Sequence, residues 1–256
     1  MKKFINKWWE RVRRFSENHG FDCDYCGKEL FEYPRKRLCR DCERSLYPVG
    51  DRVCAKCGRE TRAEGICLDC KAQARAFTQG FAPFVYLGET AAFINCMKEN
   101  KPRLSVYCGE KMSAYFVEKY PSDLPKTDAD EPFLILPVPI TAKKKWERGY
   151  NQSEQLARAV FNDFQKRGIA AEMDFDVLRK TRDNAAQKQM SSKERAQNIQ
   201  GAYHVHKRKA CRDRTILLID DILTTGATSG ECAERLLGAG AKEVHVLVFV
   251  ALPERE

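Results

Sequence analysis

"ILLIDDILTTGATSG", residues 216–230, combines a buried-strand pattern, two adjacent carboxylates and a hydroxyl-rich turn. The apolar run Ile216–Ile219 predicts a strand over about 215–220 that is covered on both faces. We expect a helix over about 228–239 to follow it, and then a strand over 243–251. This order of strand, turn, helix and strand is typical of a parallel α/β sheet.

The turn after this strand has the residue types of an anion-binding site. In an open α/β sheet, ligands bind beyond the carboxyl ends of the strands, where Asp220 and Asp221 are expected to lie. Gly226 allows the backbone to approach a phosphate, and backbone N–H groups and threonine hydroxyls can hold it. The two carboxylates can accept hydrogen bonds from neighbouring sugar hydroxyls. The candidate residues are Asp220, Asp221, Thr224, Thr225, Gly226, Ala227 and Thr228.

A plainer explanation of the stretch is a strand–turn–helix unit whose threonines cap the helix. That explanation accounts for the threonines but not for two charged residues that follow a buried strand. The phosphate-binding motif G-x-x-x-x-G-K-[ST] does not occur in the chain, so a P-loop does not explain the stretch either. The pattern therefore favours a site for a phosphorylated sugar.

The rest of the chain from residue 76 alternates between strand and helix patterns. Strands are expected over 81–87, 133–140 and about 170–178, and helices over 89–99, 108–120 and 151–168. Residues 179–200 are polar and predict a long loop. The whole pattern predicts an α/β fold with a mostly parallel sheet flanked by helices.

Eight of the twelve cysteines form four Cys-x-x-Cys pairs near the N-terminus. Two such pairs complete a tetrahedral Cys₄ zinc site. "CDYCGK" with "CRDC" is repeated as "CAKCGR" with "CLDC", which favours pairing in sequence order, although a crossed arrangement stays open. The expected ligands are Cys23, Cys26, Cys39 and Cys42 for one zinc ion, and Cys54, Cys57, Cys67 and Cys70 for a second.

Disulfides and an iron–sulfur site are the alternatives for these cysteines. A disulfide framework requires an oxidising compartment, and no export signal is visible in the sequence. The doubled ribbon pattern favours zinc, and four thiolates leave no open coordination position, so both ions are expected to be structural. Metal binding would contribute on the order of 10 kcal/mol to the folding of so short a segment.

The net charge of +9 is concentrated in residues 179–214, which carry eleven basic and three acidic residues. Such a strip suggests an anionic partner, either a phosphorylated small molecule or nucleic acid, although a solvated loop with a chance excess of charge is an alternative. Lys207, Arg208 and Lys209 are the candidate nucleic-acid contacts.

Neither of the longest apolar stretches approaches the roughly 20 residues that a transmembrane helix needs. The N-terminus is basic but lacks the apolar core of a signal peptide, so a cytoplasmic protein is expected. Phe4, Trp8, Val12 and Phe15 predict a basic amphipathic helix in this segment. That helix could touch a membrane or a partner, but packing on a neighbouring domain is the preferred interpretation.

"ILLIDDILTTGAT" resembles the phosphoribosyl pyrophosphate (PRPP) motif of type I phosphoribosyltransferases. The order of four Cys-x-x-Cys pairs, "PVPI" with "RGYNQ" (137–152), "SSKERAQNIQGAY" (191–203) and this motif is similar to the ComF family of competence-associated bacterial proteins. The resemblance covers about residues 20–252 and implies a type I phosphoribosyltransferase fold behind a double zinc ribbon. The expected division is an amphipathic helix over 1–19, the ribbons over 20–75 and the phosphoribosyltransferase-like domain over 76–256.

The resemblance also implies roles for individual residues. Asp220 and Asp221 would hold the ribose hydroxyls of PRPP, and residues 224–228 would hold its 5-phosphate. Residues 141–151 fall where the family would place the pyrophosphate loop. The candidate contacts there are Lys143, Lys144, Lys145 and Arg148. Residues 179–195 would form a flexible lid, and "INCMKENKPRL" (94–104) matches least clearly.

Two functions follow from these observations. The first is a Mg²⁺-dependent enzyme that transfers the pentosyl group of PRPP to a nitrogen acceptor, for which the sequence offers no general base. The second is a non-catalytic module that senses PRPP and binds single-stranded DNA. An adaptor that docks a competence helicase or channel protein is a further alternative. The acceptor and the partner cannot be read from the sequence.

Overall fold

The computed structural model describes residues 21–99, 101–120, 122–126, 130–182 and 199–254. The chain divides into two compact units, residues 1–45 and 46–256, and each is described by itself. The amphipathic helix predicted over 1–19 and most of the predicted lid lie outside the described residues. Among the described helices, none is long and apolar enough to cross a membrane.

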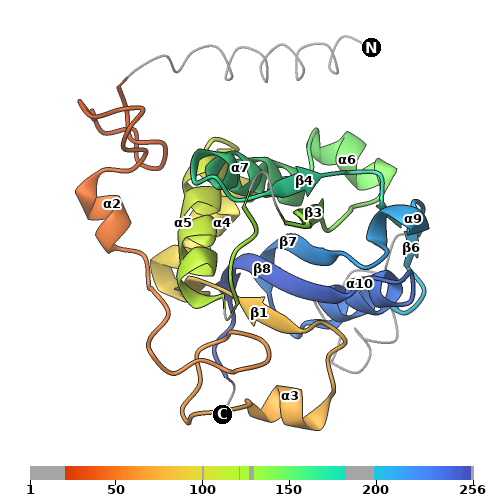
Figure 1. Cartoon of the computed structure of the whole chain (residues 1–256). Helices are drawn as coiled ribbons and strands as arrows, with labels where there is room; N and C mark the ends of the chain where they lie inside the picture. Colours follow the sequence, from red (N-terminus) through yellow and green to blue (C-terminus); the bar gives the residue numbers. More distant parts are fainter. Residues whose placement is uncertain (1–20, 100, 121, 127–129, 183–198, 255–256) are drawn as a thin grey trace. The chain divides into compact units, whose positions relative to one another are not determined.

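The larger unit is built on a parallel sheet with the strand order β1-β8-β7-β3-β4, and β2 also pairs with β8 (Figure 1). Its central strand β7 hydrogen-bonds to a parallel neighbour on each side, so the run Ile216–Ile219 is fully buried, as its apolar pattern predicts. The strands are β1 (Gln79–Phe81), β2 (Phe84–Val85), β3 (Phe133–Pro137), β4 (Ala171–Met173), β7 (Thr215–Leu223) and β8 (Glu243–Ala251).

One face of the sheet is covered by α4 (Gly88–Glu99), α5 (Leu104–Lys119) and α7 (Gln152–Lys166), which lie together in Figure 1. Aromatic rings fill the space between these helices and the sheet. The ring of Phe116 on α5 lies 5.0 Å from Phe81 of β1 and 5.8 Å from Phe164 of α7, centroid to centroid. This aromatic layer fixes the helices against the strands that carry the site.

The opposite face of the sheet packs against α10 (Ala227–Leu237) and a two-stranded antiparallel sheet formed by β5 (Leu178–Lys180) and β6 (Tyr203–Val205). A short helix, α9 (Arg208–Cys211), follows β6. The buried core on this face joins Leu218 of β7 and Leu236 of α10 to Cys54, Cys57 and Cys67. The second group of cysteines therefore belongs to the core of the larger unit.

The predicted α/β fold with a parallel sheet and a cysteine-rich N-terminal region is confirmed. Three local predictions were wrong. The strand expected over 81–87 is two short strands separated at Ala82 and Pro83, because proline has no N–H for the ladder. Within 141–151, where the resemblance implies the pyrophosphate loop, residues 142–148 form a helix. This helix, α6 (Ala142–Arg148), is capped by Thr141 and ends at Gly149. The polar strip that was expected to be a loop begins with β5.

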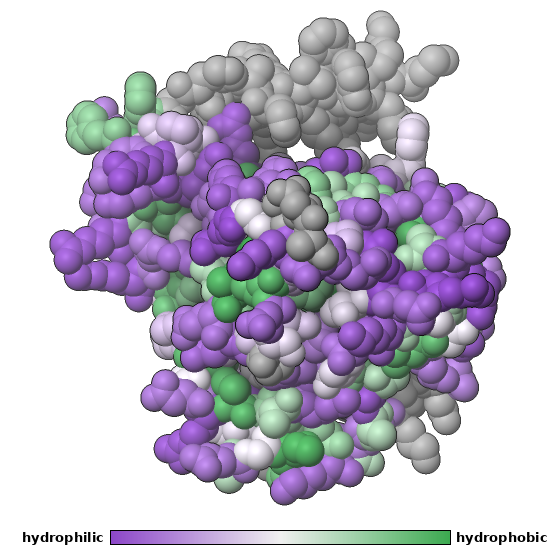
Figure 2. Space-filling view, viewed as in Figure 1, coloured by the Kyte–Doolittle hydropathy of each residue, from purple (hydrophilic) through white to green (hydrophobic). Residues whose placement is uncertain are grey.

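The predicted domain limits stay predictions. The two compact units meet between Ser45 and Leu46, a division that separates the first group of cysteines from the second. On the face shown in Figure 2, hydrophilic residues predominate and hydrophobic residues form small separate groups. Polar groups of defined chemistry gather at the end of β7 and at the cysteines.

Candidate functional site

The strand β7 continues past the two aspartates to Leu223, and Asp220 pairs with Val248 of β8. The prediction that the strand ends at Asp220 was therefore three residues short. Because side chains alternate along a strand, Asp220 and Asp221 point to opposite faces of the sheet. The Ser153 hydroxyl, at the start of α7, donates to Asp220 at 3.0 Å, and Asp221 is ion-paired with Lys98 of α4.

Asp220 is electrostatically unusual. Desolvation by the surrounding protein, and then the negative charge of Asp221, raise the pKa of Asp220 to about 7. Hydrogen bonds from Ser153 and from the backbone N–H of Asp221 oppose this rise but do not cancel it. A carboxyl group that titrates near neutral pH in the strand-end region is typical of a functional site.

Lys98 is a functional candidate that sequence reasoning missed. Its Nζ lies 3.0 Å from Asp221 Oδ2. The Tyr150 hydroxyl donates to the carbonyls of Met97 and Lys98 at 2.8 and 3.0 Å, and the Gln152 amide donates to the Lys98 carbonyl at 3.3 Å. The "RGYNQ" segment thus holds the end of α4 over β7. Only the fold brings these two segments, about fifty residues apart, together.

The turn after β7 has the backbone conformation that the sequence indicated. Gly226 has φ +73° and is the N-cap of α10. The Thr225 hydroxyl accepts a hydrogen bond from the N–H of Ala227 at 3.4 Å, and the Gly226 carbonyl accepts one from Gly230 at 2.8 Å. The first N–H groups of a helix have no partner within the helix, so this turn can present donors to an anion.

Two arginines from the cysteine-rich region border this turn, and sequence reasoning missed both. Arg75 lies beside Gly226, with its Nε 3.4 Å from the position that a Cβ would take on the glycine. Arg59 donates to the carbonyl oxygen of Thr224 at 2.7 Å. Two nearby guanidinium groups add positive charge to a turn that is already suited to anions. Nothing in the spacing of the cysteines pointed to this arrangement.

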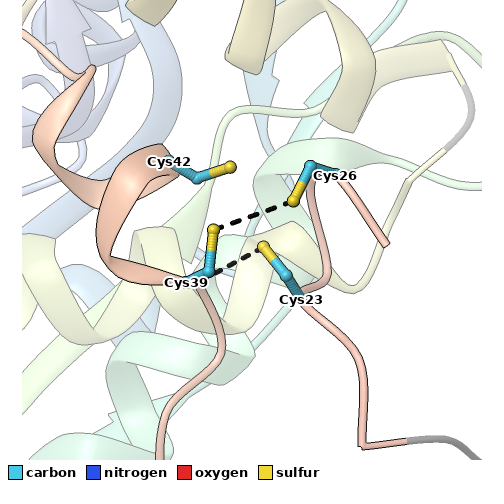
Figure 3. Close-up of side chains that lie close together, drawn as sticks. All are labelled: Cys23, Cys26, Cys39 and Cys42. Atoms are coloured by element: carbon cyan, nitrogen blue, oxygen red, sulfur yellow. Dashed lines mark hydrogen bonds between the residues drawn. The ribbon is translucent and has the colours of Figure 1, made fainter. Parts of the chain in front are cut away.

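The eight cysteines form two Cys₄ clusters, paired in sequence order as predicted. Figure 3 shows the first, in which Cys23 and Cys26 face Cys39 and Cys42. Within each cluster all four sulfur atoms lie within 4.8 Å of one another. Cys26 and Cys39 are 3.7 Å apart, as are Cys57 and Cys67. Zn–S bonds of about 2.3 Å in a tetrahedron require edges of about 3.8 Å, so both clusters fit a zinc ion.

The same distances exclude disulfides in this structure, since a disulfide bond is about 2.05 Å long. All twelve cysteines are free thiols. In both clusters the third cysteine is also the N-cap of a short helix, α2 (Arg40–Arg44) or α3 (Leu68–Ala72). Its N–H points to the sulfur of the first cysteine, at 3.2 Å in one cluster and 3.3 Å in the other. Both clusters are therefore structural sites of one repeated design.

Comparison with known proteins finds a family match for the parallel-sheet region and another for the cysteine-rich region. Residues 148–256 match the Phosphoribosyl transferase domain family, and residues 20–71 match the Double zinc ribbon domain family. The Competence protein ComFC of Bacillus subtilis is 24% identical over 221 residues, which are 86% of this chain and 86% of that protein. The chain belongs to the ComF family.

Other relatives have the same character. The Competence protein F of Haemophilus influenzae is 21% identical over 220 residues, 81% of this ComF chain and 94% of the relative. The DNA utilization protein YhgH of Escherichia coli O157:H7 is 31% identical over 115 residues, which span 45% of this chain and about half (48%) of the relative. The chain is thus a competence-related protein with a phosphoribosyltransferase-like fold.

The pyrophosphate-side candidates of this ComF chain lie on α6. Lys143 and Arg148 are exposed, and Lys144 is half-buried. The Nζ of Lys145 lies 2.7 Å from Glu154, and Arg148 donates to Gln152 at 3.3 Å, so these two cations have partners on α7. Their role toward a ligand stays a prediction.

The nucleic-acid candidates of the ComF chain surround α9. Lys207 is ion-paired with Asp174 at 2.7 Å, and Arg208 donates to the carbonyl oxygen of Gly238 at 2.6 Å. Lys209 is exposed. Two of the three cations are therefore already used in local contacts of the chain, although both side chains remain partly accessible. Whether they bind nucleic acid stays a prediction.

Proposed function

We propose that this ComF chain binds PRPP at the end of β7. The observation that carries the proposal is the turn 224–228, in which a left-handed glycine opens α10 five residues after Asp221. Backbone N–H groups and threonine hydroxyls of the turn would hold the 5-phosphate, as in other helix-start phosphate sites. Asp220 and Asp221 would accept hydrogen bonds from the ribose hydroxyls.

The cations near β7 would hold the pyrophosphate of PRPP. Lys98 already neutralises Asp221, so it lies next to the position proposed for the sugar. Lys143, Lys144, Lys145 and Arg148 on α6 are the remaining candidates. Mg²⁺ bound with PRPP would neutralise charge that grows on the departing pyrophosphate. The residues fit such a complex because carboxylates and phosphates are the oxygen ligands that Mg²⁺ prefers.

The reaction we propose is transfer of the pentosyl group to a nitrogen acceptor. The bond between the anomeric carbon and pyrophosphate breaks, and the acceptor nitrogen bonds to that carbon. Fixed positive charges around the leaving group would stabilise the transition state more than the ground state. Asp220, with its pKa of about 7, is able to exchange a proton at neutral pH. We do not assign it the removal of the proton from the acceptor nitrogen.

Calorimetric titration of PRPP with and without Mg²⁺ tests the binding. We expect Mg²⁺-dependent binding by the wild type and a loss of at least about tenfold in affinity when Asp220→Asn and Asp221→Asn are combined. Asp123→Asn, at an exposed loop position, is the control and should bind as the wild type does. Equal affinities in all three proteins would contradict the proposed site.

Pyrophosphate release from PRPP, measured across a panel of nucleobases, separates an enzyme from a sensor. Turnover that requires one acceptor and is lost in the Asp220/Asp221 double variant supports transfer. PRPP binding without turnover on any acceptor supports the sensing alternative instead. The relatives are named as a competence protein and a DNA utilization protein, which supports a role of this chain in the use of DNA.

A second candidate function is binding of single-stranded DNA, for which Trp146 supplies a specific observation. Its side chain is 84% exposed on α6, in the sequence "KKKWER". An exposed indole among lysines combines a stacking surface for a base with charge for the phosphates. Trp146→Ala should weaken binding of an oligothymidylate several-fold, and Lys209→Glu should reduce its salt dependence.

If the affinity for the oligothymidylate does not change with either substitution, or does not depend on salt, the DNA-binding function is contradicted. We propose a cytoplasmic protein in either case, with a competence helicase or channel protein as its partner. Co-purification from competent cells, with and without nuclease treatment, would distinguish a protein partner from one held through DNA.

A further inference from the structure

The two cysteine repeats differ at one equivalent pair of charged residues. Lys28 follows the first Cys-x-x-Cys-Gly, and Arg59 follows the second. Each is ion-paired with the aspartate between the last two cysteines of its repeat: Lys28 with Asp41 at 3.1 Å, and Arg59 with Asp69 at 2.5 Å. The repeat therefore preserves the ion pair while the cation changes from lysine to arginine.

The environments of the two cations are opposite. Lys28 is 66% exposed, whereas the Arg59 side chain is 2% exposed. A planar guanidinium can bond in several directions at once, which an ammonium group cannot do with the same geometry. Arg59 uses this property: one terminal nitrogen binds Asp69, and the other donates to the carbonyl oxygen of Thr224 at 2.7 Å.

The Arg59 guanidinium also lies close to the cysteine cluster. Its Nε is buried and has no hydrogen-bond acceptor within the described part of the chain. The guanidinium interacts electrostatically with Cys57 and Cys67, two of the expected zinc ligands. Arg59 thus lies between the second cysteine cluster and the turn that opens α10.

The backbone around Arg59 is held as closely as its side chain. Gly58 has φ +70°, and a Cβ there would overlap the carbonyl of Gly80 on β1. A Cβ on Gly80 would in turn lie 2.6 Å from the Cys57 carbonyl oxygen. Gly27, which is the equivalent of Gly58 in the first repeat, has φ +75° but open space where a Cβ would lie. The second ribbon is therefore seated directly on the sheet, and Arg59 has little freedom to move.

We propose that Arg59 is a positioning residue that makes the second zinc ribbon part of the phosphate-binding turn. The cluster of Cys54, Cys57, Cys67 and Cys70 and Asp69 hold the guanidinium, and the guanidinium holds the Thr224 carbonyl, which fixes the backbone of the turn. Loss of the second zinc ion or of Arg59 then loosens the turn, while loss of the first zinc ion does not. The ligand-binding consequence rests on the proposed function, but the effect on the turn does not.

Hydrogen exchange of the backbone amides, measured by mass spectrometry on the full chain, tests the effect on the turn. Arg59→Lys keeps the charge and the ion pair with Asp69, but an ammonium group cannot contact Asp69, the Thr224 carbonyl and the cysteine cluster with the geometry of the guanidinium. We expect exchange of the peptide that contains 224–229 to rise about tenfold, because a charge-assisted hydrogen bond is lost. The matched control is Lys28→Arg, at the equivalent position of the first repeat, which should leave that exchange unchanged.

Zinc content, measured on the same samples, separates positioning from simple unfolding. Arg59→Lys should keep two zinc ions for each chain, and Cys23→Ser with Cys26→Ser should keep one and leave the turn protected. Arg59→Ala is the second variant. Unchanged protection of 224–229 in both Arg59 variants overturns the proposal, and so does equal loosening after loss of the first zinc ion alone.

The affinity for Mg²⁺–PRPP completes the test. We expect the dissociation constant of Arg59→Lys to rise about tenfold relative to the wild type. If the wild type binds no PRPP, the proposed function fails, yet the exchange data still decide the role of Arg59. If the wild type binds PRPP and Arg59→Lys binds it equally well with a loosened turn, the turn does not position a phosphate and the inference is wrong.

Discussion

Asp220 shows how one residue responds to its position on the sheet. Its folded pKa, about 7, lies above the ordinary value of 3.8. A carboxyl group with a raised pKa favours the folded state while it is protonated, so its contribution is complete below about pH 4 and is lost as the pH rises through about 7. Above that pH the ionised side chain destabilises the fold, because its charge is desolvated.

Asp220→Asn should therefore stabilise the ligand-free protein at alkaline pH. Asparagine keeps an oxygen that accepts from Ser153 and from the N–H of Asp221, but it carries no charge. We expect a gain of about 1–2 kcal/mol at pH 8, after allowance for partial exposure, and little gain at pH 4. Thermal unfolding at both pH values measures it. The exposed substitution Asp123→Asn should show no such pH dependence, and an equal gain at both pH values would contradict the assignment.

At the scale of elements, α5 and α7 pack at a distance that a single glycine permits. A Cβ on Gly109 would overlap the side chain of Ala159 and lie 3.0 Å from its carbonyl carbon. This packing supports α7, whose first residues hold Asp220 and the end of α4. The position of Asp220 and of the end of α4 therefore depends on the contact between Gly109 of α5 and Ala159 of α7.

Gly109→Ala should destabilise the larger unit by about 1–3 kcal/mol, since the helices have to separate to admit a methyl group. Gly230 of α10 is the matched control, because it is also helical but has open space where its Cβ would lie. Gly230→Ala should be neutral or stabilise by up to about 1 kcal/mol. Urea unfolding of both variants measures the difference, and a stable Gly109→Ala protein would show that the packing is looser than described.

At the scale of the whole molecule, the division between Ser45 and Leu46 separates the two zinc sites. The second cluster shares its core with Leu218 and Leu236, whereas the first lies in a unit of its own. The excess of positive charge lies mostly in residues 179–214, and it makes weak association with polyanions an expected background in any binding experiment.

A chain that begins at Leu46 should therefore fold without the first ribbon. We expect one zinc ion for each molecule and a melting temperature within a few degrees of that of the full chain, because the core of the larger unit is intact. Zinc analysis and calorimetry check this. The full-length Cys54→Ser, Cys57→Ser variant should also hold one zinc ion but melt at a lower temperature, and equal melting of both variants would contradict the division.

The sequence by itself determined the parallel sheet, the four Cys-x-x-Cys pairs and the turn after β7. It favoured Cys₄ pairing in sequence order but left a crossed arrangement open, which the structure excluded. These features depend on local patterns: a continuous apolar run, the two-residue spacing of cysteines in a repeat, and a glycine among threonines. Each pattern constrains the backbone within a few residues, so it is visible without knowledge of distant contacts.

The tertiary structure alone decided which side chains border that turn. Lys98 reaches Asp221 across 123 positions, and Arg59 reaches Thr224 across 165, and neither pairing leaves a local pattern. The orientation of the two carboxylates also depends on the structure. Asp220 and Asp221 are adjacent in sequence, but because both lie within β7 their side chains point to opposite faces of the sheet. The raised pKa of Asp220 likewise arises from burial, which only the packed chain creates.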